Sequence, residues 1–120
     1  MSKTDTAVRV NPMRLTDTET GETYTLEFSR ESVRFAEQRG FKISELTDFP
    51  QLNIPAFFFY AFRKNHREVA RDKTDKLLEA MGGLTPAELA RLVELYNQPN
   101  EALIITDEGG RKNARVTVEL

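Results

Sequence analysis

Alternating apolar and polar positions near the start of the chain predict a β-hairpin. Residues 13–18 and 23–28 flank a turn-forming segment, residues 19–22, whose glycine permits a positive φ. In the second run every other side chain is apolar, as in a strand with one buried face: Tyr24, Leu26 and Phe28. Residues 1–12 are polar, and we expect them to form a flexible N-terminal arm, although Val8 and Val10 alternate enough for a short edge strand.

Two helices are predicted after the hairpin. The first has Ser29 as its N-cap and ends at Gly40, a residue that readily adopts the left-handed conformation found after helices. The second follows a break at residues 48–50 and is expected over residues 54 to about 70. Pro55 would then lie in its first turn, where the missing N–H costs nothing.

Two more helices follow. The third is expected over residues 73–81 and is closed by Gly82 and Gly83. The fourth begins at a capping box, Thr85-Pro86-Ala87-Glu88, with proline at the first helical position. Its apolar residues follow the i, i+3, i+4, i+7 spacing of one buried helix face: Leu89, Leu92, Val93 and Tyr96. We expect this helix to end near Asn97, before Pro99.

The end of the chain predicts one more strand. Val116, Val118 and Leu120 alternate with polar residues, whereas the apolar run at residues 102–106 has no diagnostic period. The simplest sheet brings this last strand against the hairpin. The predicted fold is therefore α+β: an N-terminal β-hairpin, a central cluster of about four helices and a C-terminal strand that joins the hairpin. Residues 13–120 would form a single α+β domain after the arm at residues 1–12.

Composition fits this picture and excludes several classes of protein. A chain of 120 residues, 39% hydrophobic and 30% charged, is typical of one globular domain rather than a disordered chain. The net charge of −2 gives no general attraction to nucleic acid or to anionic membranes. The absence of cysteine excludes disulfides and thiolate catalysis. The start lacks the apolar stretch of a secretory signal, so we expect an intracellular protein.

Catalytic and metal-binding patterns are absent from the sequence. His66 is the single histidine and lies in a basic run, so we expect a solvated helix residue rather than a general base. The glycine pairs 82–83 and 109–110 lack the spacing of a phosphate-binding loop. Asp107 and Glu108 supply too few ligands for a calcium loop. We therefore expect a protein that is not an enzyme and has no metal or cofactor.

The most unusual feature is residues 57–62, Phe-Phe-Phe-Tyr-Ala-Phe, which hold five of the eleven aromatic residues. In a helix this run is apolar on every side, not along one stripe. It is either a central core element or a surface for a partner, and both hold if one face packs in the core and the other against a neighbouring subunit. We expect a homo-oligomer whose interface includes part of the helix. The candidate partner-binding aromatic residues are Phe57, Phe58, Phe59, Tyr60 and Phe62.

A basic segment follows directly, with six Lys or Arg residues and three acids between residues 63 and 76. Arg63, Arg67 and Arg71 recur every four residues, so a continuous helix would align them. Two pairs have the i, i+4 spacing that would neutralise part of this charge: Lys64 with Glu68, and Arg71 with Asp75. A solvated, self-paired face is thus the first interpretation, an acidic protein partner the second, and nucleic acid the third. Candidate partner-binding residues here are Arg63, Lys64 and Arg67.

Five segments together resemble one known family. They are residues 54–66, residues 71–76, Gly82-Gly83-Leu84, Leu95-Tyr96 and residues 114–120. The chain from about Tyr24 onward is similar to the tail assembly chaperones of long-tailed bacteriophages and prophages. The resemblance implies a protein of the host cytoplasm that is absent from the virion and oligomerises. It also implies that the protein coats the apolar helices of the tape measure protein and recruits major tail tube subunits. A longer form made by ribosomal frameshifting is common in that family.

Two other classes remain open from the sequence. One is a structural virion component, such as a tail-completion or connector protein. The other is a small nucleic-acid-binding regulator, although the aromatic residues lie upstream of the basic ones and are not interleaved with them, which weakens a platform for stacking bases.

Overall fold

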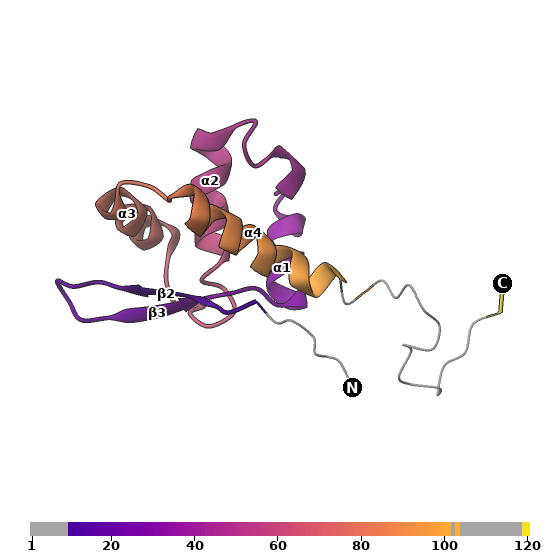
Figure 1. The fold of residues 1–120 in the computed structure, drawn as a ribbon, viewed down its shortest axis with the longest axis horizontal. Coiled ribbons are helices and arrows are strands. Elements are labelled where there is room, and N and C mark those ends of the chain that lie inside the picture. Colours follow the sequence, from indigo (N-terminus) through magenta and orange to yellow (C-terminus); the bar gives the residue numbers. More distant parts are fainter. Residues whose placement is uncertain (1–9, 102, 104–118) are drawn as a thin grey trace.

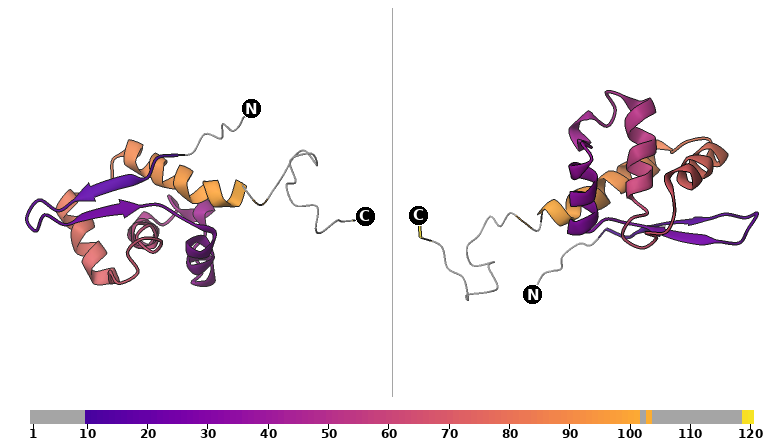
Figure 2. Two further views of the ribbon diagram at one scale, coloured as in Figure 1. Left: turned by 90° about the horizontal axis from the view of Figure 1, so that it is seen from below. Right: turned by 180° about the vertical axis from the view of Figure 1, so that it is seen from behind.

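The computed structural model describes residues 10–101, 103 and 119–120, and it has the predicted α+β architecture. An antiparallel hairpin is followed by four α-helices, all of which lie on one side of the hairpin (Figures 1 and 2). The elements are β2 (Met13–Thr16), β3 (Thr23–Leu26), α1 (Arg30–Gln38), α2 (Pro50–Tyr60), α3 (Arg71–Met81) and α4 (Pro86–Glu101). A short 3-10 helix, Ile43–Glu45, lies between α1 and α2.

The hairpin confirms the alternation seen in the sequence. Met13 pairs with Leu26, and Leu15 pairs with Tyr24, whose side chain is buried as expected. The turn closes when the N–H of Gly21 donates to the carbonyl of Asp17 over 2.7 Å, and Gly21 has the positive φ, 78°, that its lack of a Cβ permits.

Helix α1 begins as predicted. The Ser29 hydroxyl accepts from the Ser32 N–H over 3.1 Å, and the Ser29 N–H donates to the Ser32 hydroxyl over 2.8 Å. The two bonds satisfy donors that a helix start leaves unpaired. Gly40 follows the helix with a φ of 86°, so both predicted ends are confirmed to within two residues.

The bounds predicted for the second helix are wrong at both ends. Helix α2 begins at Pro50, with Phe49 as N-cap, so Pro55 lies inside the helix and not in its first turn. The carbonyl that loses its partner at Pro55 belongs to the exposed Gln51, where water can replace the missing N–H. The helix stops at Tyr60 because the carbonyl of Ala61 accepts from the N–H of Glu27 over 3.2 Å, at the edge of the hairpin.

The later helices are close to expectation. Helix α3 is closed by Gly82, which has a φ of 77°. Helix α4 continues to Glu101 and so includes Pro99, beyond the end expected near Asn97. The C-terminal strand predicted over 116–120 lies outside the described residues except for 119–120, which are in no strand, and most of the N-terminal arm also lies outside them. Within the described chain the sheet has two strands.

The core is built from aromatic rings. Phe57 stacks between Phe28 and Phe41, with centroid distances of 5.5 Å on each side. Tyr96 of α4 meets all three rings edge-on at 5.0 to 5.7 Å. Edge-to-face and offset arrangements are those that aromatic quadrupoles favour. The second half of α2 is therefore enclosed by β3, α1, α4 and the loop between α1 and α2.

Candidate functional site

Four of the five candidate aromatic residues are inside the molecule. Phe57 and Phe58 are 0% exposed, and Tyr60 and Phe62 are also buried. The core interpretation is correct for these four, and they are unavailable to a partner in this fold because other parts of the same chain cover them. Phe59 is half-buried and is the one member of the set that reaches the surface.

The basic residues are paired differently from the prediction. Lys64 lies 3.2 Å from a Glu27 carboxylate oxygen, and Arg67 lies 3.4 Å from Glu31. The expected row of arginines along a helix does not form, because α2 ends at Tyr60 and residues 61–65 make turns. The i, i+4 pair of Arg71 with Asp75 is confirmed at 2.9 Å.

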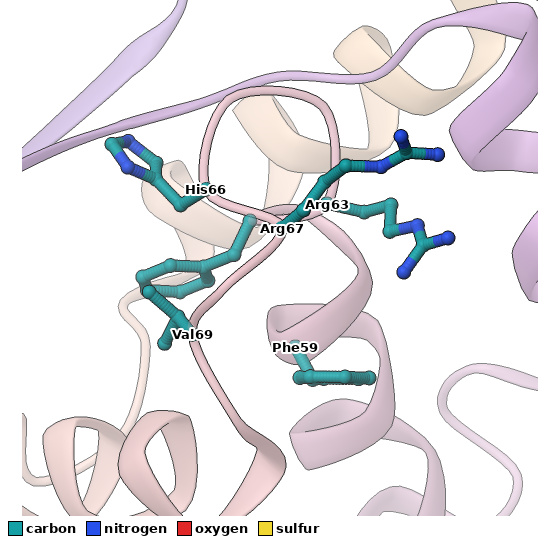
Figure 3. Close-up of a pocket in the computed structure, with 6 residues that line it drawn as sticks. Phe59, Arg63, His66, Arg67 and Val69 are labelled. Atoms are coloured by element: carbon teal, nitrogen blue, oxygen red, sulfur yellow. The ribbon is translucent and has the colours of Figure 1, made fainter.

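Figure 3 shows the surroundings of this basic segment. His66 lies on one side, whereas the guanidiniums of Arg63 and Arg67 point away from it on the other, above the ring of Phe59. The hollow that these residues line has a volume of about 10 Å³. A space of that size holds about one water molecule, so it is not a pocket for an organic ligand.

His66 is a structural residue and not the solvated helix residue that we expected. Its Nε2 accepts a hydrogen bond from the backbone N–H of Thr25 over 3.0 Å, and its ring meets Tyr24 edge-on at 5.3 Å. Beside it, the amide of Asn65 donates to the carbonyl of Thr25 over 3.1 Å. The two side chains occupy the outer edge of β3, which would otherwise offer free backbone groups to another strand.

A search of the described residues finds no group of three or more His, Cys, Asp or Glu side chains that could hold a metal ion. Within the same part of the chain, no helix has the length and apolar character needed to cross a membrane.

An apolar groove is a better candidate for binding a partner than the small hollow at the basic segment. It lies where the start of α2 faces the end of α3 and the start of α4, and it has a volume of about 250 Å³. Its lining is Pro50, Gln51, Ile54, Pro55, Leu78, Gly83, Leu84 and Leu89. The adjoining hollow adds a polar border, formed by the Arg71–Asp75 ion pair and Glu79.

The N-cap and first turn of α2 carry two exposed apolar side chains. Phe49 is 60% exposed and Leu52 is 69% exposed. They are three residues apart, so they share a face, and the helical spacing directs that face away from Gln51 and Ile54. The start of α2 is thus apolar on two sides. Sequence reasoning missed both surfaces because it read residues 48–50 as a break and began the helix at Ile54.

Comparison with known proteins identifies a family. A search of curated proteins and a search of solved structures gave no match. The family model described as "Domain of unknown function (DUF5055)" matches residues 1–120, the whole chain. The protein therefore belongs to the DUF5055 family.

Proposed function

We propose that this protein is a non-catalytic tail assembly chaperone of a long-tailed bacteriophage or prophage. It would oligomerise in the host cytoplasm, bind helices of the tape measure protein and recruit major tail tube subunits. The resemblance from about Tyr24 to the C-terminus supports this assignment. A chaperone for a long helical client needs no active site, only an apolar contact surface and a polar border that keeps it in solution.

The observation that carries the proposal is the apolar groove between α2, α3 and α4. Grooves of this kind accept the apolar face of an amphipathic helix, whose anchor residues recur every three or four positions. Ile54, Leu78 and Leu84 would contact those anchors, and the Arg71–Asp75 pair at the border would meet the polar face. The proposed client site is therefore the groove and not the buried Phe57, Phe58, Tyr60 and Phe62.

The test is to fill the groove without removing any core side chain. Gln51 is exposed and lines the groove, so Gln51→Trp should occupy the space that the client helix needs. Gln38→Trp, the same change at an exposed position at the end of α1, is the matched control. Each protein is co-expressed with a tape measure fragment and recovered by affinity pull-down.

We expect the wild type and Gln38→Trp to retain the fragment and Gln51→Trp to lose it. Equal retention by both variants would remove the groove from the client site. Failure of the wild type to retain any tape measure segment, together with detection of the protein in purified virions by mass spectrometry, would favour a structural virion component. A chaperone is expected to be missing from virions.

A further inference from the structure

Two arginines lie against the ring of Phe35 in α1. The guanidinium carbon of Arg39 is 3.7 Å from the ring centroid, and that of Arg63 is 3.8 Å from it. Two guanidiniums at these distances cannot share one face of a ring without colliding, so they lie on opposite faces. The three side chains form a layered stack, the Arg–Phe–Arg site, in which each cation meets the negative face of the ring.

Among the described residues, neither of these arginines has a carboxylate within salt-bridge distance, unlike Arg67, whose guanidinium pairs with Glu31 next to the stack. Moreover, the Nε of Arg63 is buried and makes no hydrogen bond to any described group. That nitrogen lies inside the fold, so a partner can meet Arg63 only through the outer edge of its guanidinium, Nη1 and Nη2. The site therefore presents two positive charges that no described carboxylate neutralises.

We propose that the Arg–Phe–Arg site binds two carboxylates of an acidic helix in a protein partner. A guanidinium over an aromatic ring can still direct its outer Nη1 and Nη2 edge to a carboxylate and pair with it bidentately. Acidic side chains four residues apart on a helix begin about 5–6 Å apart and can reach both cations. Phe59 is also half-buried, and arginine and aromatic residues are both enriched in protein interfaces.

This inference does not rest on the proposed function, since the site lies at the end of α1 and in the turn after α2, whereas the apolar groove lies at the start of α2. The two surfaces use different chemistry. The groove offers apolar contacts, and the Arg–Phe–Arg site offers charge-assisted hydrogen bonds.

The probe is a fluorescein-labelled, alanine-based helical peptide that carries two glutamates four residues apart. A matched peptide carries glutamine at both positions. Fluorescence anisotropy gives the dissociation constant for each. We expect the wild type to prefer the glutamate peptide, and Arg39→Gln to weaken that binding about tenfold, the loss that one charge-assisted hydrogen bond produces. Phe35→Leu keeps an apolar side chain but removes the stacking face, and should weaken binding as well.

Arg30→Gln is the control, because Arg30 is an exposed arginine of the same helix that does not stack on Phe35. It should bind the glutamate peptide as the wild type does. Circular dichroism checks that each variant is folded, and Arg39, which is exposed, can be replaced without loss of core packing. Equal binding of the two peptides by the wild type, or equal losses in Arg30→Gln and Arg39→Gln, would overturn the proposal.

Discussion

The imidazole of His66 links the segment after α2 to the edge of the hairpin through a hydrogen bond. Its Nε2 accepts from the Thr25 N–H, and both groups are partly buried. His66→Leu keeps an apolar body in contact with Tyr24 but leaves that N–H without an acceptor. We expect the free energy of unfolding to fall by about 1–2 kcal/mol, as measured by chemical denaturation.

The control for His66 is its exposed neighbour. Arg67→Gln removes an ion pair whose two side chains are mostly in water, and such pairs contribute only about 0–1 kcal/mol. Residue-resolved hydrogen exchange adds a direct readout, because the Thr25 amide should exchange faster in His66→Leu and at its normal rate in Arg67→Gln. Unchanged exchange in both variants would show that the hydrogen bond does not protect Thr25.

The hydroxyl groups of two buried tyrosines have opposite situations. The hydroxyl of Tyr96 is buried and has no hydrogen-bond partner among the described groups, whereas that of Tyr24 donates to Glu22 over 3.0 Å. Tyr96→Phe should therefore raise the free energy of unfolding by about 1 kcal/mol, and Tyr24→Phe should lower it by a similar amount. Thermal denaturation of the two variants at neutral pH measures both, and the same sign for both would contradict the contrast.

The stability at alkaline pH should also depend on Tyr96. Burial, with smaller contributions from Glu37 and Tyr60, raises the pKa of Tyr96 to about 12 from its ordinary value of 10.0. The unfolded chain releases this proton first, so ionisation favours unfolding. The contribution is fully present below pH 10 and is lost as the pH rises through 12. Urea denaturation across this window should show a shallower loss for Tyr96→Phe than for the wild type.

At the scale of elements, helix ends that are set by nearby residues were predicted, and those set by distant contacts were not. The capping residues of α1 and α4 act within four residues of themselves, so Ser29 and Thr85 could be recognised from the sequence. The end of α2 depends on the N–H of Glu27, which lies more than thirty residues away in the chain and takes the carbonyl of Ala61. No local pattern contains that hydrogen bond.

In helix α4 the contributions of the N-cap and of the buried face to the free energy of unfolding can be compared. Its capping box is present, with the Thr85 hydroxyl accepting from the Glu88 N–H over 3.1 Å, and Leu92 is 0% exposed. Thr85→Ala should lower the free energy of unfolding by about 1 kcal/mol. Leu92→Ala should lower it by about 2–5 kcal/mol because it leaves a cavity in the core. If chemical denaturation showed a larger loss for Thr85→Ala than for Leu92→Ala, Leu92 would not belong to the buried face of α4.

At the scale of the whole molecule, the sequence identified where apolar side chains are dense but not which of them remain exposed. The ring of Phe57 is covered by Phe28, Phe41 and Tyr96, which come from three separate parts of the chain. Exposure is therefore a property of the assembled fold.

The homo-oligomer was expected to use part of residues 54–62, but four of the five aromatic side chains there are buried. We therefore propose that the interface uses the exposed Phe49 and Leu52 at the start of α2 instead. Phe49 and Leu52 are the most exposed large apolar side chains on the helices or helix caps of the described chain, and burying the exposed part of each against a second copy contributes about 1–2 kcal/mol. We expect analytical ultracentrifugation at micromolar concentration to detect an oligomer that the double variant Phe49→Ser, Leu52→Ser dissociates. Both changes lie on the exposed face of α2, so they should leave the fold intact.

The matched control is Leu103→Ser, which changes another exposed leucine, 58% exposed, beyond the end of α4. If general surface hydrophobicity drove self-association, this variant would weaken the oligomer as well. An interface centred on the first turn of α2 predicts instead that Leu103→Ser sediments as the wild type does. A wild type that sediments as a monomer would contradict the expected homo-oligomer.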